Sequence, residues 1–432
     1  MNINITVKCA TCGEPTNCRI GLSVRYERPL RFSCQDCGSP IDIFLADPKG
    51  AMLGKSRPKI EGAVQVPSST PFDSDTNFVD LHQDFPVSFG KYVMGMTPFM
   101  MASRRIEFEA LQLHGSRLAQ LDEQHGQVRD FTNLLKLYAK DRIAPFKLNV
   151  ERVFKIHVKS DLPQDINAAL YRLIADVMAP FAFPGQNEDV VEHYNQMLFN
   201  LTSEEPLRQA LFDFVNDVVS SGFLKKTQLD CLEIYPKIIA AEKPLRPAFF
   251  LDFDDEYAKY PLALRVSVDE FSTYKDLYKD ITEIISRQMI LVAGVNNIMK
   301  RGDFNTFLPG IGKTVRADRT PKSLAEYAGV NFGLKLNYID ETWFEFVDGA
   351  ADNQLRNAIA HYKTDYNDVT QEIYYFPRRE GMEEKKYESI YFIEFMKRIL
   401  IAYREMHRLH HLIKALFYLK FLLIDRIGDS AG

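Results

Sequence analysis

The 432-residue sequence has no long uncharged apolar segment. Its most apolar run, Ile413 to Ile424, is interrupted by Lys414 and Lys420 and falls short of the roughly 18 residues that a membrane helix needs. The first residues, MNINITVKC, lack the basic segment and the apolar stretch of a signal peptide. We therefore expect a cytoplasmic protein that makes no membrane contact.

The sequence also lacks an excess of positive charge, because 53 Lys and Arg residues face 58 Asp and Glu residues, a net charge of -5. Bulk charge therefore cannot hold a nucleic acid, and any such binding must use local basic patches. The hydrophobic fraction of 46% and the charged fraction of 26% are those of a globular protein with enough apolar side chains for two or three cores.

Cysteine is scarce, and five of the six cysteines lie in the first 37 residues. Four of them form two C-x-x-C pairs, each followed by a glycine that allows two thiolates of one tight turn to face the same ion. In a cytosolic chain this spacing favours a metal site over disulfides. It predicts a closed structural Zn²⁺ site in a small β-rich ribbon, with no open coordination position for catalysis. Cys18 lies outside the pattern, and the predicted ligands are Cys9, Cys12, Cys34 and Cys37.

Composition and periodicity divide the chain into four predicted segments. Residues 1–45 form the zinc ribbon, and residues 46–90, rich in Pro and Ser, are typical of a linker or of a loop over a neighbouring domain. Apolar residues at three- and four-residue spacing predict a central helical region over 91–249 and a helical domain over 250–432. We expect a mainly α fold, a helical bundle with one small β-rich module. The clearest amphipathic helices are predicted at 105–121, 128–138, 164–177, 273–297 and 388–426.

The stretch LRNAIAHY, Leu355 to Tyr362, places three polar groups on a predicted helix. Asn357 and His361 are four residues apart and share one face, and Arg356 lies about 100 degrees round the axis from Asn357. The alanines between them favour close approach of another helix, including a second copy of this one. A lone Arg and His near a helix end are otherwise surface or capping groups.

The hexapeptide RNAIAH resembles the R-x4-H signature of the HEPN superfamily, helical domains many of which are metal-independent ribonucleases. The resemblance extends over about residues 250–423, because a predicted β-hairpin follows His361 and a long apolar helix begins near Glu388, an order that many HEPN domains share. Tyr362 departs from the pattern, since glycine is frequent at that position.

The resemblance implies an endoribonuclease whose site is shared by a homodimer. His361 would be the general acid or base, Arg356 would stabilise the scissile phosphate, and Asn357 would orient either of them. It also implies RNA as the substrate, a role as a toxin or antiphage abortive-infection effector, and a regulatory protein or phage-derived trigger as a further partner.

A second, weaker candidate for RNA contact is the basic segment between residues 300 and 322. Its GIGKT sequence is not a P-loop, because Phe307 stands where the first glycine of that motif is required. The segment is either a phosphate-contacting loop or a solvated one. The residues predicted to contact RNA are Lys300, Arg301, Lys313, Arg316 and Arg319.

Other functions remain open on the sequence alone. The chain could be a non-catalytic HEPN-like scaffold whose ribbon binds nucleic acid or protein, since basic residues such as Arg19 and Arg31 alternate with aromatic ones there. A scaffold would bury Arg356 and His361 in satisfied hydrogen bonds, whereas a nuclease exposes them. The sequence MHRLHHL, with His407, His410 and His411, is interpreted as a partly exposed helix edge rather than a metal site.

Overall fold

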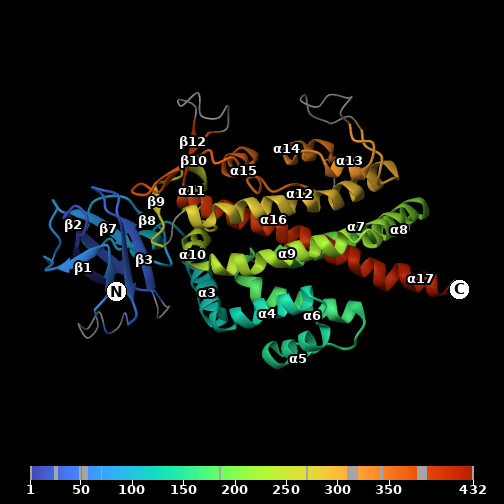
Figure 1. The fold of residues 1–432 in the computed structure, drawn as a ribbon, viewed down its shortest axis with the longest axis horizontal. Coiled ribbons are helices and arrows are strands. Elements are labelled where there is room, and N and C mark those ends of the chain that lie inside the picture. Colours follow the sequence, from blue (N-terminus) through green and yellow to red (C-terminus); the bar gives the residue numbers. More distant parts are fainter. Residues whose placement is uncertain are drawn as a thin grey trace. The chain divides into compact units, whose positions relative to one another are not determined.

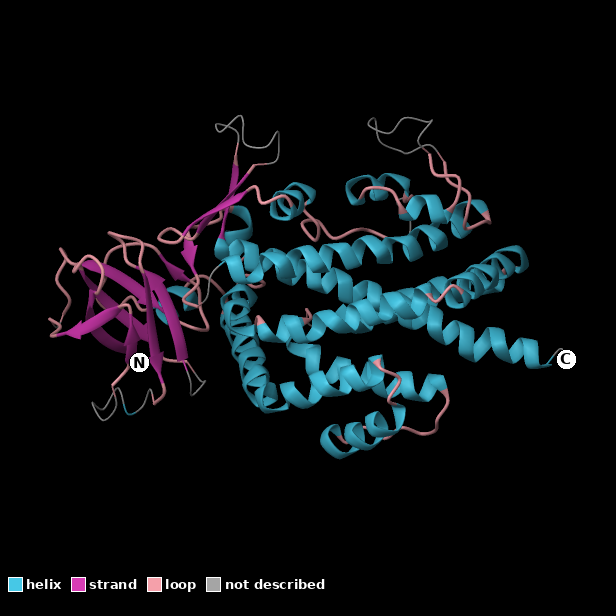
Figure 2. Ribbon diagram, in the orientation of Figure 1, coloured by secondary structure: helices cyan, strands magenta, loops and turns pink. Residues whose placement is uncertain are grey.

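The computed structural model describes residues 2–23, 28–47, 50, 57–69, 71–183, 186–268, 271–308, 320–340, 344–376 and 387–430. The fold is mainly helical with a small β-rich N-terminal module, as the sequence predicts (Figure 2). The chain divides into two compact units that alternate along the sequence instead of following one another. The first is Met1–His125, Ala240–Asp276 and Gln354–Leu400, and the second is Gly126–Ile239, Leu277–Asn353 and Ile401–Gly432.

The N-terminal module contains two sheets with a common apolar core (Figure 1). In the first sheet, of order β6-β1-β2-β7, β1 (Asn2–Cys9), β2 (Pro15–Gly21) and β6 (Ala63–Val66) are antiparallel, and β7 (Asn77–Leu81) runs parallel to β2. The second sheet joins β3 (Arg28–Ser33), β4 (Pro40–Leu45) and β5 (Lys59–Glu61). Alternating apolar residues of β3 and β4 face this core, whereas β2 is buried on both faces.

The segment predicted as a linker, residues 46–90, differs from that prediction because it contributes strands to both sheets. It supplies β5, β6 and β7, and also β8 (Val87–Ser88), which pairs with β9 (Leu264–Arg265). Short strands between prolines and serines resemble a loop locally, and only pairing with the distant β1, β2 and β4 shows that they are strands. Gly62 turns between β5 and β6 with φ +78, where an added Cβ would lie 2.3 Å from the Pro40 carbonyl oxygen.

Helices complete the first unit. They are α2 (Pro98–Ser103), α3 (Phe108–Gln124), α10 (Glu242–Phe250), α11 (Asp255–Lys259) and α15 (Asn353–Ala360). The fully buried guanidinium of Arg246 on α10 contacts Asp84 at 2.7 Å, Asp122 at 2.9 Å and Glu242 at 2.5 Å. Since removing one partner of a buried ion pair leaves an uncompensated charge, this cluster holds α3, α10 and the chain after β7 in one arrangement.

The second unit is a helical bundle. It contains α4 (Val128–Ala139), α5 (Ile143–Phe154), α6 (Pro163–Met178), α7 (Gln186–Ser203), α8 (Glu205–Ser220), α9 (Phe223–Ala240), α13 (Leu324–Ala328), α14 (Phe332–Lys335) and α17 (Asp425–Ser430). Short 3₁₀ turns lie at His125–Gln127, Ala179–Phe181 and Leu336–Tyr338. The long helices α12 (Phe271–Arg301) and α16 (Phe392–Leu419) take part in both units, and a π-helical turn, Lys420–Ile424, follows α16. Within the described residues, no helix combines the length and apolar character that crossing a bilayer requires.

Two of the three histidines predicted to form a partly exposed edge of α16 differ from that prediction, whereas His411 is half-buried. His407 and His410 are buried, and both Nδ1 atoms contact the hydroxyl of Tyr235, at 2.9 and 2.7 Å. Gln228 donates to the Tyr171 hydroxyl at 3.1 Å, and that hydroxyl lies 3.3 Å from His410 Nε2. Both tyrosine hydroxyl protons have an acceptor if Tyr171 donates to His410 Nε2 and Tyr235 donates to His407 Nδ1. The His410 Nδ1–H then donates to the Tyr235 oxygen. Both imidazoles are therefore neutral, in agreement with burial that lowers their pKa values.

Candidate functional site

Four thiols of the N-terminal module converge, as the C-x-x-C pairs predict. Their Sγ atoms all lie within 4.8 Å of one another, with Cys9 to Cys37 at 3.7 Å and Cys12 to Cys34 at 3.6 Å. Four sulfurs around an ion at about 2.3 Å in a tetrahedron are separated by about 3.8 Å. The cluster therefore has the dimensions of a closed four-thiolate metal site.

The two C-x-x-C turns have the same backbone geometry. The N–H of Gly13 donates to the Cys9 carbonyl at 3.0 Å, and the N–H of Gly38 donates to the Cys34 carbonyl at 2.9 Å. Both glycines have positive φ, +82 and +74, which a residue with a Cβ adopts only with strain. The Ser39 hydroxyl and backbone N–H lower the pKa of the Cys37 thiol to about 6, whereas burial raises the pKa of the Cys34 thiol, so the thiols of the cluster do not ionise equally readily.

Cys18 takes no part in this cluster. It is buried in β2, and burial raises the pKa of its thiol. It is a core residue, in agreement with its place outside the spacing pattern.

The second candidate site is the C-terminal end of α15. Leu355, Ala358 and Ile359 are buried and form the inward side of this helix. Arg356 is half-buried, and its Nη1 donates to Asn357 Oδ1 at 2.9 Å. Because the Ala358 side chain is buried within the chain, it cannot contact a second copy of the helix, which differs from the role that the sequence suggested.

His361 lies directly after this helix with an exposed side chain. Its backbone N–H donates to the Asn357 carbonyl at 3.0 Å, so the helical turn continues and places the imidazole one turn beyond the Asn357 amide. The outward side of α15 therefore presents a guanidinium, an amide and an imidazole. The structure brings Arg356, Asn357 and His361 onto one accessible side.

Tyr362 occupies the left-handed region, φ +56, where the family pattern often has glycine. The Tyr362 N–H donates to the Ile359 carbonyl at 3.3 Å, and the Lys363 N–H donates to the Ala358 carbonyl at 2.8 Å. These two bonds are those of a Schellman motif, the common way in which a helix ends at a left-handed residue. The turn that glycine would favour is thus present here with a tyrosine.

A cation beside Tyr362 has no signal in the sequence. The Tyr362 side chain is 87% exposed, and Lys275 at the start of α12 places its Nζ 5.9 Å from the centre of that ring. Because Lys275 precedes the motif by many residues, only the fold shows that a further cation lies there.

The hairpin after His361 is present as predicted, and a third strand joins it before the long helix begins. It comprises β10 (Thr364–Asn367), β11 (Glu372–Tyr375) and β12 (Glu388–Tyr391). The Gln371 side chain forms 2.8 Å hydrogen bonds with both the N–H and the carbonyl of Val266. The next residue, Ser267, accepts through its carbonyl from the Arg31 N–H of β3 at 2.8 Å. The segment around Val266 thus links the N-terminal module to the hairpin that follows His361.

Of the five residues predicted to contact RNA, the structure describes two, Lys300 and Arg301. Arg301 is a buried partner of Asp340, at 2.8 Å, and belongs to the second unit, where Lys300 is exposed. Lys313, Arg316 and Arg319 lie outside the described residues.

In the N-terminal module, the Arg19 guanidinium is buried against Asp80 at 2.7 Å and cannot reach a nucleic acid. Arg31 pairs with Asp42 at 2.7 Å and keeps about a third of its side chain exposed.

Comparison of the chain with protein-family models, with curated proteins and with solved structures finds no match in any of the three. Function is therefore argued from the two sites themselves.

Proposed function

We propose that this protein is a metal-independent endoribonuclease of the HEPN type, acting in the cytosol as a toxin or antiphage effector. The observation that carries the proposal is the end of α15, where His361 and Asn357 are exposed beside Arg356. A scaffold role would favour an imidazole enclosed in hydrogen bonds instead.

The chemistry needs a base, an acid and a positive charge. The base takes the proton from the 2'-hydroxyl, whose oxygen then attacks phosphorus, and the acid gives a proton to the 5'-oxygen as the P–O5' bond breaks. The products are a 2',3'-cyclic phosphate and a free 5'-hydroxyl, and no metal or water takes part in this step. Arg356 would bind the phosphate oxygens, whose negative charge grows in the transition state.

The motif at the end of α15 supplies one histidine, His361, whereas the reaction needs both a base and an acid. We therefore propose that two copies of the chain form the site as a homodimer. His361 of one copy would act as the base, and His361 of the partner subunit would act as the acid. The outward stripe of α15, which includes Asn357 and Ala360, would lie at the twofold axis, because the opposite stripe is buried within the chain.

The surroundings of His361 favour an RNA strand as the ligand. Lys275 supports the exposed ring of Tyr362, and such a ring provides a surface on which a base stacks. The Arg31 N–H donates to the Ser267 carbonyl, and the neighbouring Val266 is hydrogen-bonded to Gln371 of the hairpin. The N-terminal module would thus have a structural role for the hairpin that follows His361.

We further propose that the four cysteines hold Zn²⁺. Zinc favours a tetrahedral set of four thiolates, and such a site has no open position for a reacting water. The ion would stabilise the module, and the chemistry would stay with His361 and Arg356.

The experiment is incubation of purified protein with total RNA in EDTA, comparing the parent with His361→Ala. His125→Ala is the matched control, since His125 is an exposed histidine at the end of α3. Cleavage by the parent and the control but not by His361→Ala supports the proposal. Equal cleavage by all three proteins would show that His361 has no catalytic role, and no cleavage by the parent would favour the scaffold.

A further inference from the structure

The helical hairpin formed by α4 and α5 is strongly basic in an acidic protein. Residues 128–155 contain seven Lys and Arg against three Asp and Glu, a local charge of +4 in a chain of net charge -5. The cations are Arg129, Lys136, Lys140, Arg142, Lys147, Arg152 and Lys155, and the anions are Asp130, Asp141 and Glu151.

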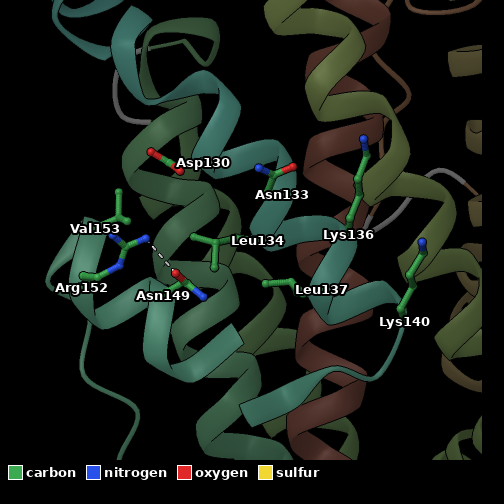
Figure 3. Close-up of a pocket in the computed structure, with 9 residues that line it drawn as sticks. All are labelled: Asp130, Asn133, Leu134, Lys136, Leu137, Lys140, Asn149, Arg152 and Val153. Carbon is green, nitrogen blue, oxygen red and sulfur yellow. Dashed lines mark hydrogen bonds between the residues drawn. The ribbon is translucent and has the colours of Figure 1, made fainter. Parts of the chain in front are cut away.

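A groove of about 390 Å³ lies between the two helices (Figure 3). Lys136 and Lys140 extend from α4 on one side of it, and Arg152 of α5 lies on the other. Leu134 and Leu137 lie between them, so that the groove has an apolar centre and cationic sides.

Within the part of the chain that the structure describes, the cations that line the groove have no anionic partner. Among the described residues, no carboxylate lies within the 4.0 Å of an ion pair from Lys136, Lys140 or Arg152. By contrast, the neighbouring Lys147 pairs with Asp161 at 2.7 Å. The lining includes one acid, the half-buried Asp130. Since like charges in proximity repel, the arrangement favours an external anion in this groove.

The Arg152 guanidinium is held in place by a neutral group. Its Nη2 donates to Asn149 Oδ1 at 2.9 Å, which leaves its other N–H groups available to a ligand. Asn149 Nδ2 donates to the Pro145 carbonyl at 2.8 Å and is itself fixed on α5. The guanidinium is therefore oriented without being neutralised.

The spacing along α4 fits a chain of phosphates better than a single anion. Arg129, Asn133, Lys136 and Lys140 follow one another at intervals of four, three and four residues, so all four are exposed on one helix face. At 1.5 Å per residue they extend over about 16 Å. Arg129 lies outside the groove lining, so the row of cations continues along the helix face past the groove. Such a row matches a polyanion, and the exposed Asn133 amide can donate to phosphate or sugar oxygens.

We propose that the groove between α4 and α5 binds the phosphate backbone of single-stranded RNA. The proposal rests on the proposed ribonuclease function for the identity of the nucleic acid, and on the groove itself for the phosphates. It assigns substrate binding to a part of the second unit that the R-x4-H motif does not include.

The test measures binding of a fluorescent oligouridine by anisotropy, in EDTA, with every protein carrying His361→Ala to prevent cleavage. The groove variant is Lys136→Gln/Lys140→Gln/Arg152→Gln. The control variant, Lys159→Gln/Lys226→Gln/Lys243→Gln, removes the same charge from lysines outside the groove lining. Circular dichroism confirms that all of the proteins are folded.

For single strands, log Kd changes with log salt by about 0.7 per phosphate contact, so losing three contacts lowers the slope by about 2 and weakens binding about 100-fold at 0.1 M salt. We expect this change in the groove variant and little change in the control. Equal binding by the two variants overturns the proposal. Equally tight binding of a polyglutamate peptide overturns the assignment to RNA, because the groove would then be a site for any polyanion.

The two proposals fail in different ways. If the parent does not cleave RNA but binds it through the groove, the nuclease proposal is wrong and the groove proposal stands. If cleavage depends on His361 while the groove variant binds like the control, the groove proposal alone is wrong. In the active protein, the groove variant should raise KM and leave kcat at saturating RNA unchanged.

Discussion

Replacing Tyr362 by glycine tests whether the turn after α15 is strained. Tyr362 has φ +56 and an 87% exposed side chain, so the substitution removes little packing. The left-handed conformation costs a residue with a Cβ about 1 to 2 kcal/mol, and glycine avoids this cost. Glycine adds freedom to the unfolded chain, which offsets about 0.4 to 1 kcal/mol. We therefore expect a net local stabilisation of about 0.5 to 1 kcal/mol.

The assay is hydrogen exchange of the Tyr362 and Lys363 amides, which donate to the last carbonyls of α15. A gain of this size slows their exchange by about 2- to 5-fold. Tyr362→Asn, a residue that tolerates the left-handed region, is the matched control and should also gain protection. Faster exchange in Tyr362→Gly would refute the reasoning, because the ring and its contact with Lys275 would then outweigh the backbone strain. The same variant should bind RNA more weakly if a base stacks on Tyr362.

Three further predictions concern the metal site and the buried polar groups. Cys34→Ser should abolish stoichiometric zinc in metal analysis and unfold the N-terminal module, whereas Cys18→Ala keeps one zinc per chain; zinc retained in Cys34→Ser would contradict the four-thiolate site. Tyr235→Phe leaves two buried imidazole nitrogens without their partner and should cost about 2 to 4 kcal/mol in denaturant unfolding, whereas the exposed Tyr260→Phe changes little. Burial lowers the pKa of His407 to about 4. Its unfolded pKa is near 6.5, so its contribution to stability is complete above pH 6.5 and is lost as pH falls toward 4. If the melting temperature of His407→Gln depends on pH in this range as the parent's does, this contribution of His407 is excluded.

The cluster of four cysteines is the part that the sequence predicts best, because it depends on local spacing. Two residues between cysteines and a following glycine specify each turn, and only the meeting of the two turns depends on the sheets. The long helices are likewise predicted, since apolar residues at helical spacing depend on a single buried stripe. The hairpin after His361 also follows from its local pattern.

Features that depend on distant residues are missed. Strands β5 to β8 pair with partners far along the chain, and their own composition is that of a loop. His407 and His410 resemble surface residues until Tyr235 and Tyr171 are seen to enclose them. Ala358 has the small side chain of a helix contact, yet it is already buried within a single copy of the chain. In each case tertiary packing, which a linear pattern does not contain, decides the environment.

The groove between α4 and α5 can be predicted from the sequence only in part. Its excess of Lys and Arg can be counted in the sequence, but the sequence does not show which of them have carboxylate partners. The structure separates Lys147, paired with Asp161, from Lys136 and Lys140, which face the groove. Unpaired cations are the ones that a phosphate backbone can use.

The central claim is that His361 cleaves RNA without a metal ion. The most direct measurement is the rate of RNA cleavage in EDTA by the parent, His361→Ala and His125→Ala, with end-group analysis of the products. The account predicts 2',3'-cyclic phosphate ends from the parent and from His125→Ala, and a rate at least about 100-fold lower for His361→Ala. Cleavage by His361→Ala at the parental rate, or cleavage that requires a divalent metal, would contradict it.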